Sequence, residues 1–206
     1  MSSSHPVTLD NVCLKVTDGS HFSPHDDPSS SIPMFSVKDM QKYDFNFSSC
    51  KHISQDVFNK MVANDCVPHI NDILVAKDGS YLKEIFICNE ERNIAVLSSI
   101  AIFRPDTNII YPEILLAFLK SPAVLRAARD NYVSGSALPR IVLKDFKKLQ
   151  FSLPDKDGQK QMADILIAFR NRIASNVAEN VALANLRDSL LSRLMSGELD
   201  VSSIDF

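Results

Sequence analysis

The sequence predicts an α+β protein, with a mixed α/β domain over residues 1–154 and a long C-terminal helix within residues 155–206. Short apolar runs rich in β-branched residues alternate with polar turns and helical segments as far as Pro154. From about Asp157 to Met195 the pattern is helical only and contains no proline. Apolar residues recur there in steps of three and four, which is the period of one helix face.

Composition places the chain among ordinary globular proteins. Its 206 residues leave room for one sizeable domain with an appendage, or for two small domains. The hydrophobic fraction is 45% and the charged fraction 23%, and the net charge of −3 argues against indiscriminate coating of nucleic acid. The first ten residues lack the basic start and apolar core of a signal peptide. No apolar run approaches the ~18 residues that a membrane span needs.

The first part of the domain should be a polar loop followed by short strands. Residues 17–31 are rich in turn formers. Strands are expected at residues 32–37 and around Ile53, since both stretches are apolar and β-branched. Residues 55–63 are expected to form a short helix with Ser54 as its cap.

The middle of the domain should hold further strands. Residues 72–77 and 84–88 are expected to form a strand pair, with a turn at residues 78–80. Residues 94–103 are a third strand region. Short strands on either side of residues 143–149 would close the domain.

Two prolines mark helix starts. Pro112 and Pro122 suit the first turn of a helix, where the missing N–H does no harm, and Ser121 can cap the second helix. The sequence therefore predicts helices of roughly residues 112–120 and 122–131.

Basic residues concentrate near the end of the domain. From Lys120 to Lys160 there are nine Lys and Arg residues against four Asp residues, a local charge of +5. Any anion-binding surface of the protein should draw on this segment.

The cysteines do not form a metal or disulfide pattern. They stand at positions 13, 50, 66 and 88, and none is part of a C-x-x-C pair. We interpret them as reduced thiols of a cytoplasmic protein, without a zinc site.

The sequence shows no catalytic constellation and no cofactor motif. Its five glycines are dispersed, so no phosphate-binding loop is present, and no Asn-Pro-Pro-aromatic stretch indicates an adenine methyltransferase. His21 and His25 with the two adjacent aspartates could be drawn as a metal cluster, but a solvated loop is the better interpretation. Ser134 and Ser136 lack a nearby histidine or aspartate, so a polar turn is favoured over a nucleophile. We expect no cofactor and no metal.

The helical stretch of about 39 residues would form a rod of roughly 58 Å. Such a rod cannot bury its apolar stripe along its full length against a domain of ~150 residues. We therefore expect the stripe to pair with a second helix, most simply in an antiparallel coiled coil, with Asn176 and Asn180 fixing the register. The alternative is a helix that folds back on its own domain. The apolar positions are Met162, Leu166, Phe169, Ile173, Val177, Leu183, Leu186, Leu190 and Leu194.

The order of short motifs resembles the specificity subunits of type I restriction–modification systems. The stretches that carry the resemblance are TDGSHFSP, IPMFSVKDM, KHIS, NDILVAKDGS, SGSALPRIVLKDFKKLQFSLP and GQKQMADIL, together with the helix expected after Tyr111. They cover roughly residues 9–200 in the family's order. Each motif is weak alone, but seven in sequence are strong.

The chain departs from the family pattern in three places. Asn71 stands where the family commonly has glycine, and Gly158 where an acid commonly precedes Gln159-Lys160. The usual subunit has two recognition domains and two spacer helices, and this chain has one of each. It therefore resembles a half-subunit.

The resemblance implies a non-catalytic DNA-recognition module. Residues 1–154 would be the target-recognition domain, and residues 155–206 the spacer and dimerisation helix with its tail. The implied partners are double-stranded DNA, a second copy of the chain, DNA methyltransferase (modification) subunits and a translocating restriction subunit. Two antiparallel copies would read a split palindromic target, whereas pairing with a different half-subunit would give an asymmetric target.

We expect the DNA contacts on three polar or basic loops, because loops on a rigid scaffold carry function. Arg140 could equally form a salt bridge at the base of the domain, and the three C-terminal lysines of the set are expected to face phosphates or solvent. The candidate residues are His21, Lys77, Tyr81, Lys83, Ser134, Ser136, Arg140, Lys144, Lys147 and Lys148.

Two other classes of protein fit the same sequence. One is a coiled-coil interaction protein, such as a decoy that occupies modification subunits without reading DNA. The other is the detached specificity part of a single-chain restriction–methylation enzyme. Sequence-selective DNA binding separates the first from a specificity subunit, and co-purification with separate methylase chains separates the second.

Overall fold

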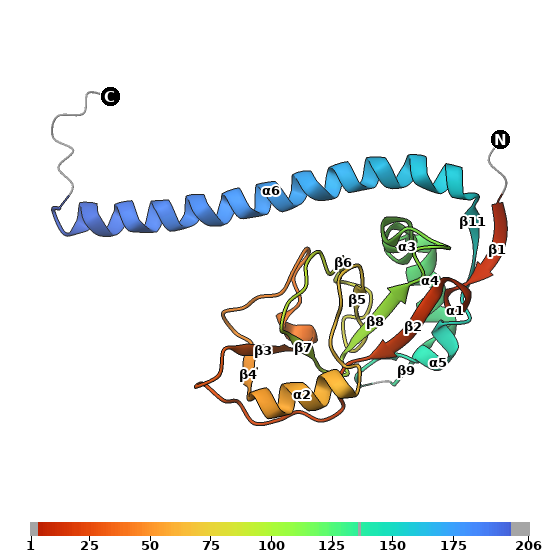
Figure 1. The fold of residues 1–206 in the computed structure, drawn as a ribbon, viewed down its shortest axis with the longest axis horizontal. Helices are drawn as coiled ribbons and strands as arrows, with labels where there is room; N and C mark the ends of the chain where they lie inside the picture. Colours follow the sequence, from red (N-terminus) through yellow and green to blue (C-terminus); the bar gives the residue numbers. More distant parts are fainter. Residues whose placement is uncertain (1–3, 136, 199–206) are drawn as a thin grey trace. The chain divides into compact units, whose positions relative to one another are not determined.

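The computed structural model describes residues 4–135 and 137–198 (Figure 1). The chain divides into two compact units, Met1–Asp164 and Ile165–Phe206. The first is a mixed α/β domain, and the second continues the long helix α6 (Lys156–Met195). The α+β class with a long C-terminal helix is therefore confirmed. The division between the units falls within α6.

A four-stranded antiparallel sheet forms the centre of the first unit. Its strands, in order, are β2 (Cys13–Asp18), β8 (Ile100–Pro105), β5 (Ile73–Ala76) and β6 (Ile85–Ile87). The expected strand pair with a turn between its members is thus β5 and β6. Every residue of these two strands is buried, which explains why both are continuous apolar runs rather than alternating ones.

A second sheet has three strands, in the order β4 (Lys51–Ile53), β3 (Ile32–Phe35) and β7 (Ala95–Val96). β3 pairs antiparallel with β4 and parallel with β7. The strand region expected at residues 94–103 is therefore two strands that belong to different sheets. A turn separates them, in which Ile100 N donates to Leu97 O at 2.9 Å.

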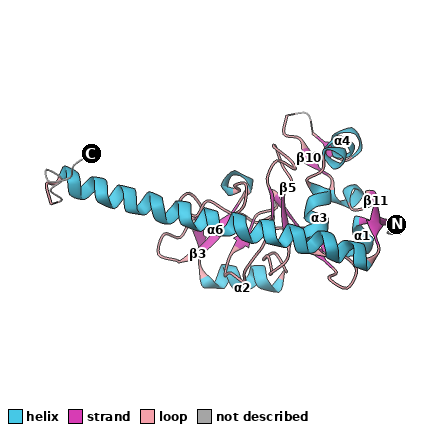
Figure 2. Ribbon diagram, turned by 90° about the horizontal axis from the view of Figure 1, so that it is seen from above, coloured by secondary structure: helices cyan, strands magenta, loops and turns pink. Residues whose placement is uncertain are grey.

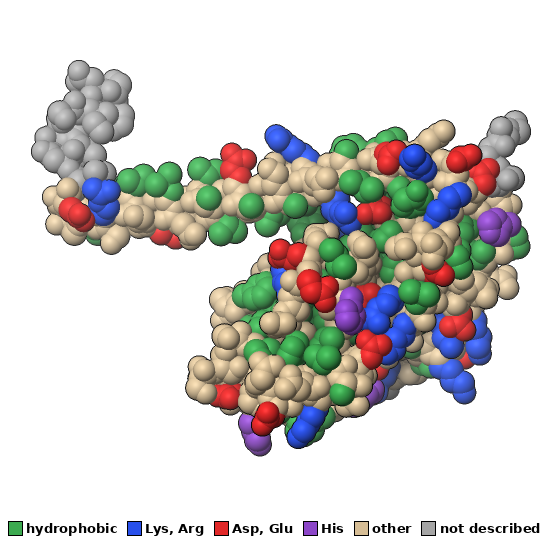
Figure 3. All heavy atoms as spheres, viewed as in Figure 1, with side chains coloured by type: hydrophobic (Ala, Val, Ile, Leu, Met, Phe, Trp, Pro, Cys, Tyr) green, Lys and Arg blue, Asp and Glu red, His purple; other side chains and the backbone are tan. Residues whose placement is uncertain are grey.

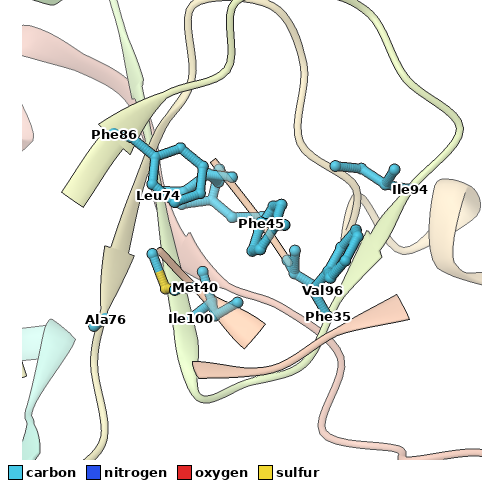
Figure 4. Close-up of a cluster of buried hydrophobic side chains, with 10 residues drawn as sticks. Phe35, Met40, Phe45, Leu74, Ala76, Phe86, Ile94, Val96 and Ile100 are labelled. Carbon is cyan, nitrogen blue, oxygen red and sulfur yellow. The ribbon is translucent and has the colours of Figure 1, made fainter. Parts of the chain in front are cut away.

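The apolar core between these elements is rich in aromatic rings (Figure 4). Phe35 and Phe45 stack with their centroids 4.1 Å apart, and Phe86 meets Phe45 edge-on at 5.1 Å. A second buried cluster, which includes Met34 and Phe58, lies around β3 and α2 (Gln55–Ala63). Each such side chain stabilises the fold by about 1.5–3 kcal/mol through burial.

The two ends of the domain's chain meet in a strand pair, of which the sequence indicated only the second strand. β1 (Ser4–Thr8) pairs antiparallel with β11 (Gln150–Pro154), so that residue 4 lies opposite residue 154. α1 (Leu9–Val12) follows β1. β1 is mostly polar and exposed, which is why its sequence carried no strand signal. A shorter pair joins β9 (Val133–Ser134) to β10 (Arg140–Ile141). Residues 143–149 are flanked by β10 and β11, as expected.

The remaining helices of the domain are η1 (Val37–Asp39), α3 (Pro112–Leu119), α4 (Pro122–Asn131) and α5 (Leu143–Phe146). Both predicted proline starts are confirmed, and the Ser121 hydroxyl accepts a hydrogen bond from Val124 N at 3.3 Å. Ser54 occupies the cap position of α2, but its side chain makes no capping hydrogen bond.

α6 is one continuous helix of 40 residues, about 60 Å long (Figure 2). Its start is capped by Asp155, whose Oδ1 accepts from Gly158 N at 2.9 Å. Gly158 therefore occupies the position at which a capping box would have an acidic or amide side chain. Gly197 follows the helix with φ +73°, as expected for a C-terminal cap.

Candidate nucleic-acid interface

One end of the four-stranded sheet gathers the segments that the sequence singled out. β2 and β5 end there, and β8 and β6 begin there, because neighbouring strands run antiparallel. We call this end, with residues 18–22, 77–84 and 139–141, the loop edge. The opposite end, with residues 65–72, 88–91 and 104–111, we call the helix edge, since the first turn of α6 is bonded to it.

Asp18 joins two of the predicted segments. One carboxylate oxygen lies 2.5 Å from Lys77 Nζ, and the other lies 3.2 Å from His21 Nε2. Lys77 is only 7% exposed, so its ammonium group is held in this pair and is not free at the surface. The His21 side chain is 78% exposed. Of these two predicted DNA contacts, the structure therefore presents His21 and uses Lys77 to fix the loop.

Gly19 and Ser20 hold this loop against the end of β7. A Cβ atom on Gly19 would lie 2.1 Å from Val96 O, so no other residue fits this position without displacing backbone. Ser20 N donates to the same carbonyl at 2.8 Å, and the Ser20 hydroxyl accepts from Phe22 N at 3.1 Å. The D-G-S-H stretch is thus a turn held by hydrogen bonds. Its last residue, His21, and the next residue, Phe22, have exposed side chains.

The turn at residues 77–84 and the hairpin at residues 134–141 lie against each other. Gly79 N donates to Pro139 O at 2.8 Å, and Ile141 N donates to Lys77 O at 3.0 Å. Gly79 has a φ of +68°, in the left-handed region that favours glycine. The structure therefore brings the second and third predicted segments together at the loop edge.

Several exposed side chains of this edge have the chemistry to bind an anion or the edge of a base. Lys83, Ser134 and Arg140 are exposed, and Tyr81 is half-buried. Arg140 has no ion pair among the described residues, so the structure does not show the salt bridge considered as its alternative role. Ser136 lies outside the described residues.

Sequence reasoning missed Lys38. A cavity of about 410 Å³ at the loop edge is lined by Lys38 of η1, Lys83, Asp78, Glu84 and Leu138, among others. η1 reaches this place because Val37 N donates to the Ser99 hydroxyl at 3.0 Å, across 62 residues of sequence. No local pattern could have indicated that contact.

The three remaining candidates lie in or next to α5, where Lys144 is exposed and Lys147 and Lys148 have acidic partners. Lys147 lies 3.2 Å from Asp10 of α1, and Lys148 lies 3.0 Å from Asp145. Figure 3 shows Lys and Arg side chains near α5 interleaved with acidic ones. These contacts favour a solvated, internally paired face over a set of free phosphate ligands.

The helix edge is held by an ion network. Arg104 Nε and Nη2 donate to the two oxygens of Asp72 at 3.0 and 2.9 Å, and the Asp72 side chain is 1% exposed. Arg104 also contacts Asp65 at 3.2 Å, and Lys15 pairs with the same carboxylate. Asn71, which replaces the family's glycine, has a φ of +70°, a conformation that asparagine tolerates better than most residues.

These contacts shift the pKa values of the network. The hydrogen bond to Asp72 raises the pKa of Arg104 above its ordinary value, although burial opposes this. Burial alone would raise the pKa of Asp65, but Lys15 and Arg104 outweigh it and lower the pKa. Burial, with the nearby Asp10, raises the pKa of the Cys13 thiol to about 12. The charged forms of Arg104 and Asp65 are therefore part of the folded state.

The first turns of α6 are anchored at the helix edge by Gln159, which is 2% exposed. Its Nε2 donates to Ile109 O at 3.1 Å and to Pro154 O at 3.0 Å, and its Oε1 accepts from Tyr111 N at 3.3 Å. Ala163, one turn further, is fully buried. The Q-K motif of the sequence thus fixes the start of the long helix to the domain.

The apolar positions along α6 are mostly exposed. Leu166 and Ile173 are half-buried. The other predicted positions are between 39% and 65% exposed, and they are Met162, Phe169, Val177, Leu183, Leu186, Leu190 and Leu194. Leaving this much apolar surface in water is unfavourable, so the stripe has the character of an interface.

The described part of the chain holds no group of three or more His, Cys, Asp or Glu side chains that could bind a metal ion. Its four cysteines are free. None of the described helices combines the length and apolar character needed to cross a membrane.

Comparisons with known proteins agree with this architecture. The family described as type I restriction modification DNA specificity domain matches residues 5–184. The MjaVIII type I restriction enzyme specificity subunit of Methanocaldococcus jannaschii is 26% identical over 139 residues, which are 68% of this chain and 31% of that protein. The HindI type I restriction enzyme specificity subunit of Haemophilus influenzae is 27% identical over 114 residues, which are 55% of this chain and 24% of that protein. The matches thus span less than a third of these relatives.

Solved structures share the fold. The type I S subunit from M. genitalium aligns with a TM-score of 0.67 and 18% identity, over 95% of this chain and 46% of that one. The HsdS subunit from Thermoanaerobacter tengcongensis aligns with a TM-score of 0.56 and 17% identity, over 98% and 51%. Because the family match covers most of its length, this chain belongs to the type I restriction modification DNA specificity domain family.

Proposed function

We propose that this chain is a non-catalytic DNA sequence-recognition subunit of a type I restriction–modification system, and that it reads double-stranded DNA with the loop edge. One observation carries the proposal: three segments far apart in sequence converge at one end of one rigid sheet. The Asp18–Lys77 pair joins the first to the second, and the Gly79–Pro139 hydrogen bond joins the second to the third.

The chemistry of the loop edge suits duplex DNA. Its exposed donors include an imidazole, two ammonium groups and a guanidinium, from His21, Lys38, Lys83 and Arg140. Ammonium groups neutralise phosphates, and a guanidinium can hold a guanine edge with two hydrogen bonds. The sheet and its buried ion pairs keep these groups in place, so that little order has to be gained on binding.

The exposed stripe of α6 supports a second part of the proposal. Two copies of the chain would pair antiparallel through the stripe, since a two-fold dimer is the commonest closed arrangement. Two identical recognition domains would then bind a split palindromic target. A helix of about 60 Å would set the half-sites more than one duplex turn, or ~34–36 Å, apart. The division of residues 1–154 for reading and 155–206 for spacing belongs to this proposal.

The partners follow from that arrangement. Modification subunits would dock along the paired helices and be directed to the target, and a restriction subunit would join them. The complex would work in the cytoplasm on chromosomal DNA, and this chain would contribute no cofactor or metal chemistry of its own.

Selection from a random duplex library tests the reading function. The purified full chain, alone and with its modification subunits, should enrich a split sequence, and Lys83→Ala with Arg140→Ala should weaken the enrichment. Arg129→Ala, which removes an exposed arginine of α4, is the matched control. A chain that binds modification subunits yet enriches no sequence would be a decoy, and the reading function would be wrong.

Light scattering tests the assembly. The full chain should have the mass of a dimer at micromolar concentration, and Leu186→Asp should make it a monomer because it places a charge in the stripe. Lys160→Asp, a charge change at an exposed position outside the predicted stripe, should leave the mass unchanged. A monomeric wild-type chain would contradict pairing between copies.

A further inference from the structure

Asp78 and Arg140 are cross-strand neighbours at the loop edge. The two residues form an antiparallel bridge. The hydrogen bonds on either side of it, from Gly79 N to Pro139 O and from Ile141 N to Lys77 O, mark it as a non-hydrogen-bonded pair. In such a pair the Cα atoms are about 4.5 Å apart and both side chains point to one face.

These two opposite charges do not pair with each other. Asp78 Oδ1 is buried without a hydrogen-bond partner among the described residues. Arg140 is exposed, and its guanidinium has no hydrogen bond or ion pair among them either. A buried oxygen that lacks a donor costs about 1–3 kcal/mol, so this carboxylate is suited to a donor from outside the fold. The Lys77–Asp18 pair beside it shows that this edge can pair its charges where the fold needs them.

We propose that Asp78 and Arg140 together read one G·C base pair in the major groove, an inference that rests on the proposed DNA-reading function. Guanine presents two acceptors there, O6 and N7, which match the paired donors of a guanidinium. Cytosine presents one donor, the N4 amino group, which matches a carboxylate oxygen. The two residues carry this complementary set side by side, and no other Watson–Crick pair has it. Because Asp78 Oδ1 is buried, the carboxylate has to turn outward to reach the base.

Selection from a random duplex library tests the inference, with full-length wild type, Asp78→Ala and Arg140→Ala. Wild type should enrich a sequence that contains a G·C pair at which both variants lose their preference. All other positions should keep theirs. For the sequence that wild type selects, Arg140→Ala should lower the affinity by about 5- to 150-fold. The exposed neighbours Arg129 and Asp130 of α4 are the matched controls, and their alanine variants should change no position.

Base analogues at that position distinguish a contact in the major groove from one in the minor groove. Replacing the guanine by 7-deazaguanine removes N7, and this should weaken wild type but not Arg140→Ala. Replacing it by inosine removes only the minor-groove amino group and should change neither. Sensitivity to inosine instead of 7-deazaguanine would overturn the major-groove assignment.

Thermal unfolding checks that the variants fold. Asp78→Ala removes a carboxylate whose buried Oδ1 has no partner among the described residues, so its Tm should equal or exceed that of wild type. The inference is wrong if wild type selects a sequence and both variants select it with unchanged preferences, or if they lose preference at two different positions. If wild type selects no sequence at all, the reading function itself fails.

Discussion

The two ends of the central sheet use the same residue types in opposite ways. At the helix edge, Arg104 is bonded to Asp72 and Asp65, and Gln159 satisfies three backbone groups. At the loop edge Asp18 and Lys77 are also paired, but Arg140 is exposed and Asp78 keeps a buried oxygen that has no donor among the described residues. Both ends belong to the same four strands, so the difference lies in the side chains that the loops supply.

On the proposed function, this difference distinguishes residues that stabilise the fold from residues that bind DNA. A charge whose partner is part of the fold stabilises that fold and has nothing left for a ligand. A charge without such a partner adds little stability, yet keeps its hydrogen-bonding capacity for another molecule. Variants at the helix edge should therefore alter the free energy of unfolding, and variants at the loop edge should alter DNA binding.

Arg104→Ala should have the largest effect. It leaves the buried Asp72 carboxylate without its countercharge, which should lower the free energy of unfolding by about 3–5 kcal/mol in urea denaturation. Arg129→Ala breaks an exposed pair with Asp130 and should cost no more than about 0.5 kcal/mol. Equal costs for the two variants would show that the helix edge is not held by its ion pair.

Lys83→Ala should weaken DNA binding and leave the stability of the fold unchanged. Loss of one phosphate contact should weaken binding to all duplex sequences and reduce the slope of log affinity against log salt by about 1. The free energy of unfolding should stay within about 0.5 kcal/mol of wild type. Fluorescence anisotropy over a salt series measures the slope, and Lys60→Ala on α2 is the matched control. An unchanged slope in Lys83→Ala would remove this lysine from the DNA surface.

Asn71 tests the backbone of the helix edge. Its φ of +70° disfavours a residue with an ordinary side chain, so Asn71→Ala should cost about 1 kcal/mol of unfolding free energy. Asn71→Gly should be neutral or slightly stabilising, since glycine adopts this conformation readily. Chemical denaturation of both variants measures this difference in unfolding free energy. An alanine variant as stable as the glycine variant would contradict the prediction.

The lowered pKa of Asp65 predicts the smallest effect, an acid dependence of stability. A carboxyl group whose pKa is lower in the folded state stabilises that state above its unfolded pKa, and the stabilisation is lost as the pH falls through the folded pKa. Unfolding free energies should thus decline below about pH 4. Asp65→Asn, which suits the φ of +52° at this position, should show a shallower decline. A decline of the same steepness would assign it to other carboxylates.

The sequence predicted the elements whose signals are local. Proline starts marked α3 and α4, buried apolar runs marked β5 and β6, and the absence of proline marked α6. β1 and β2 went unnoticed because few of their side chains are buried. The strand region at residues 94–103 was divided by a turn that the run of apolar residues concealed.

The sequence singled out the segments of the candidate site, but it did not resolve the role of each residue. Motifs pointed to the three loops that meet at the loop edge. That Lys77 is committed to Asp18, 59 residues away, depends on a tertiary contact that no motif encodes. The same holds for Lys38, which η1 brings to the cavity, and for Asp78, whose proposed role rests on a buried oxygen without a partner among the described residues.

Hydrogen–deuterium exchange with and without duplex DNA tests the contrast between the two edges most directly. DNA of the selected sequence should slow exchange in residues 19–22, 77–84 and 137–141, and leave residues 65–72 and 88–91 unchanged. Protection at the helix edge without protection at the loop edge would contradict the assignment of the DNA-reading surface.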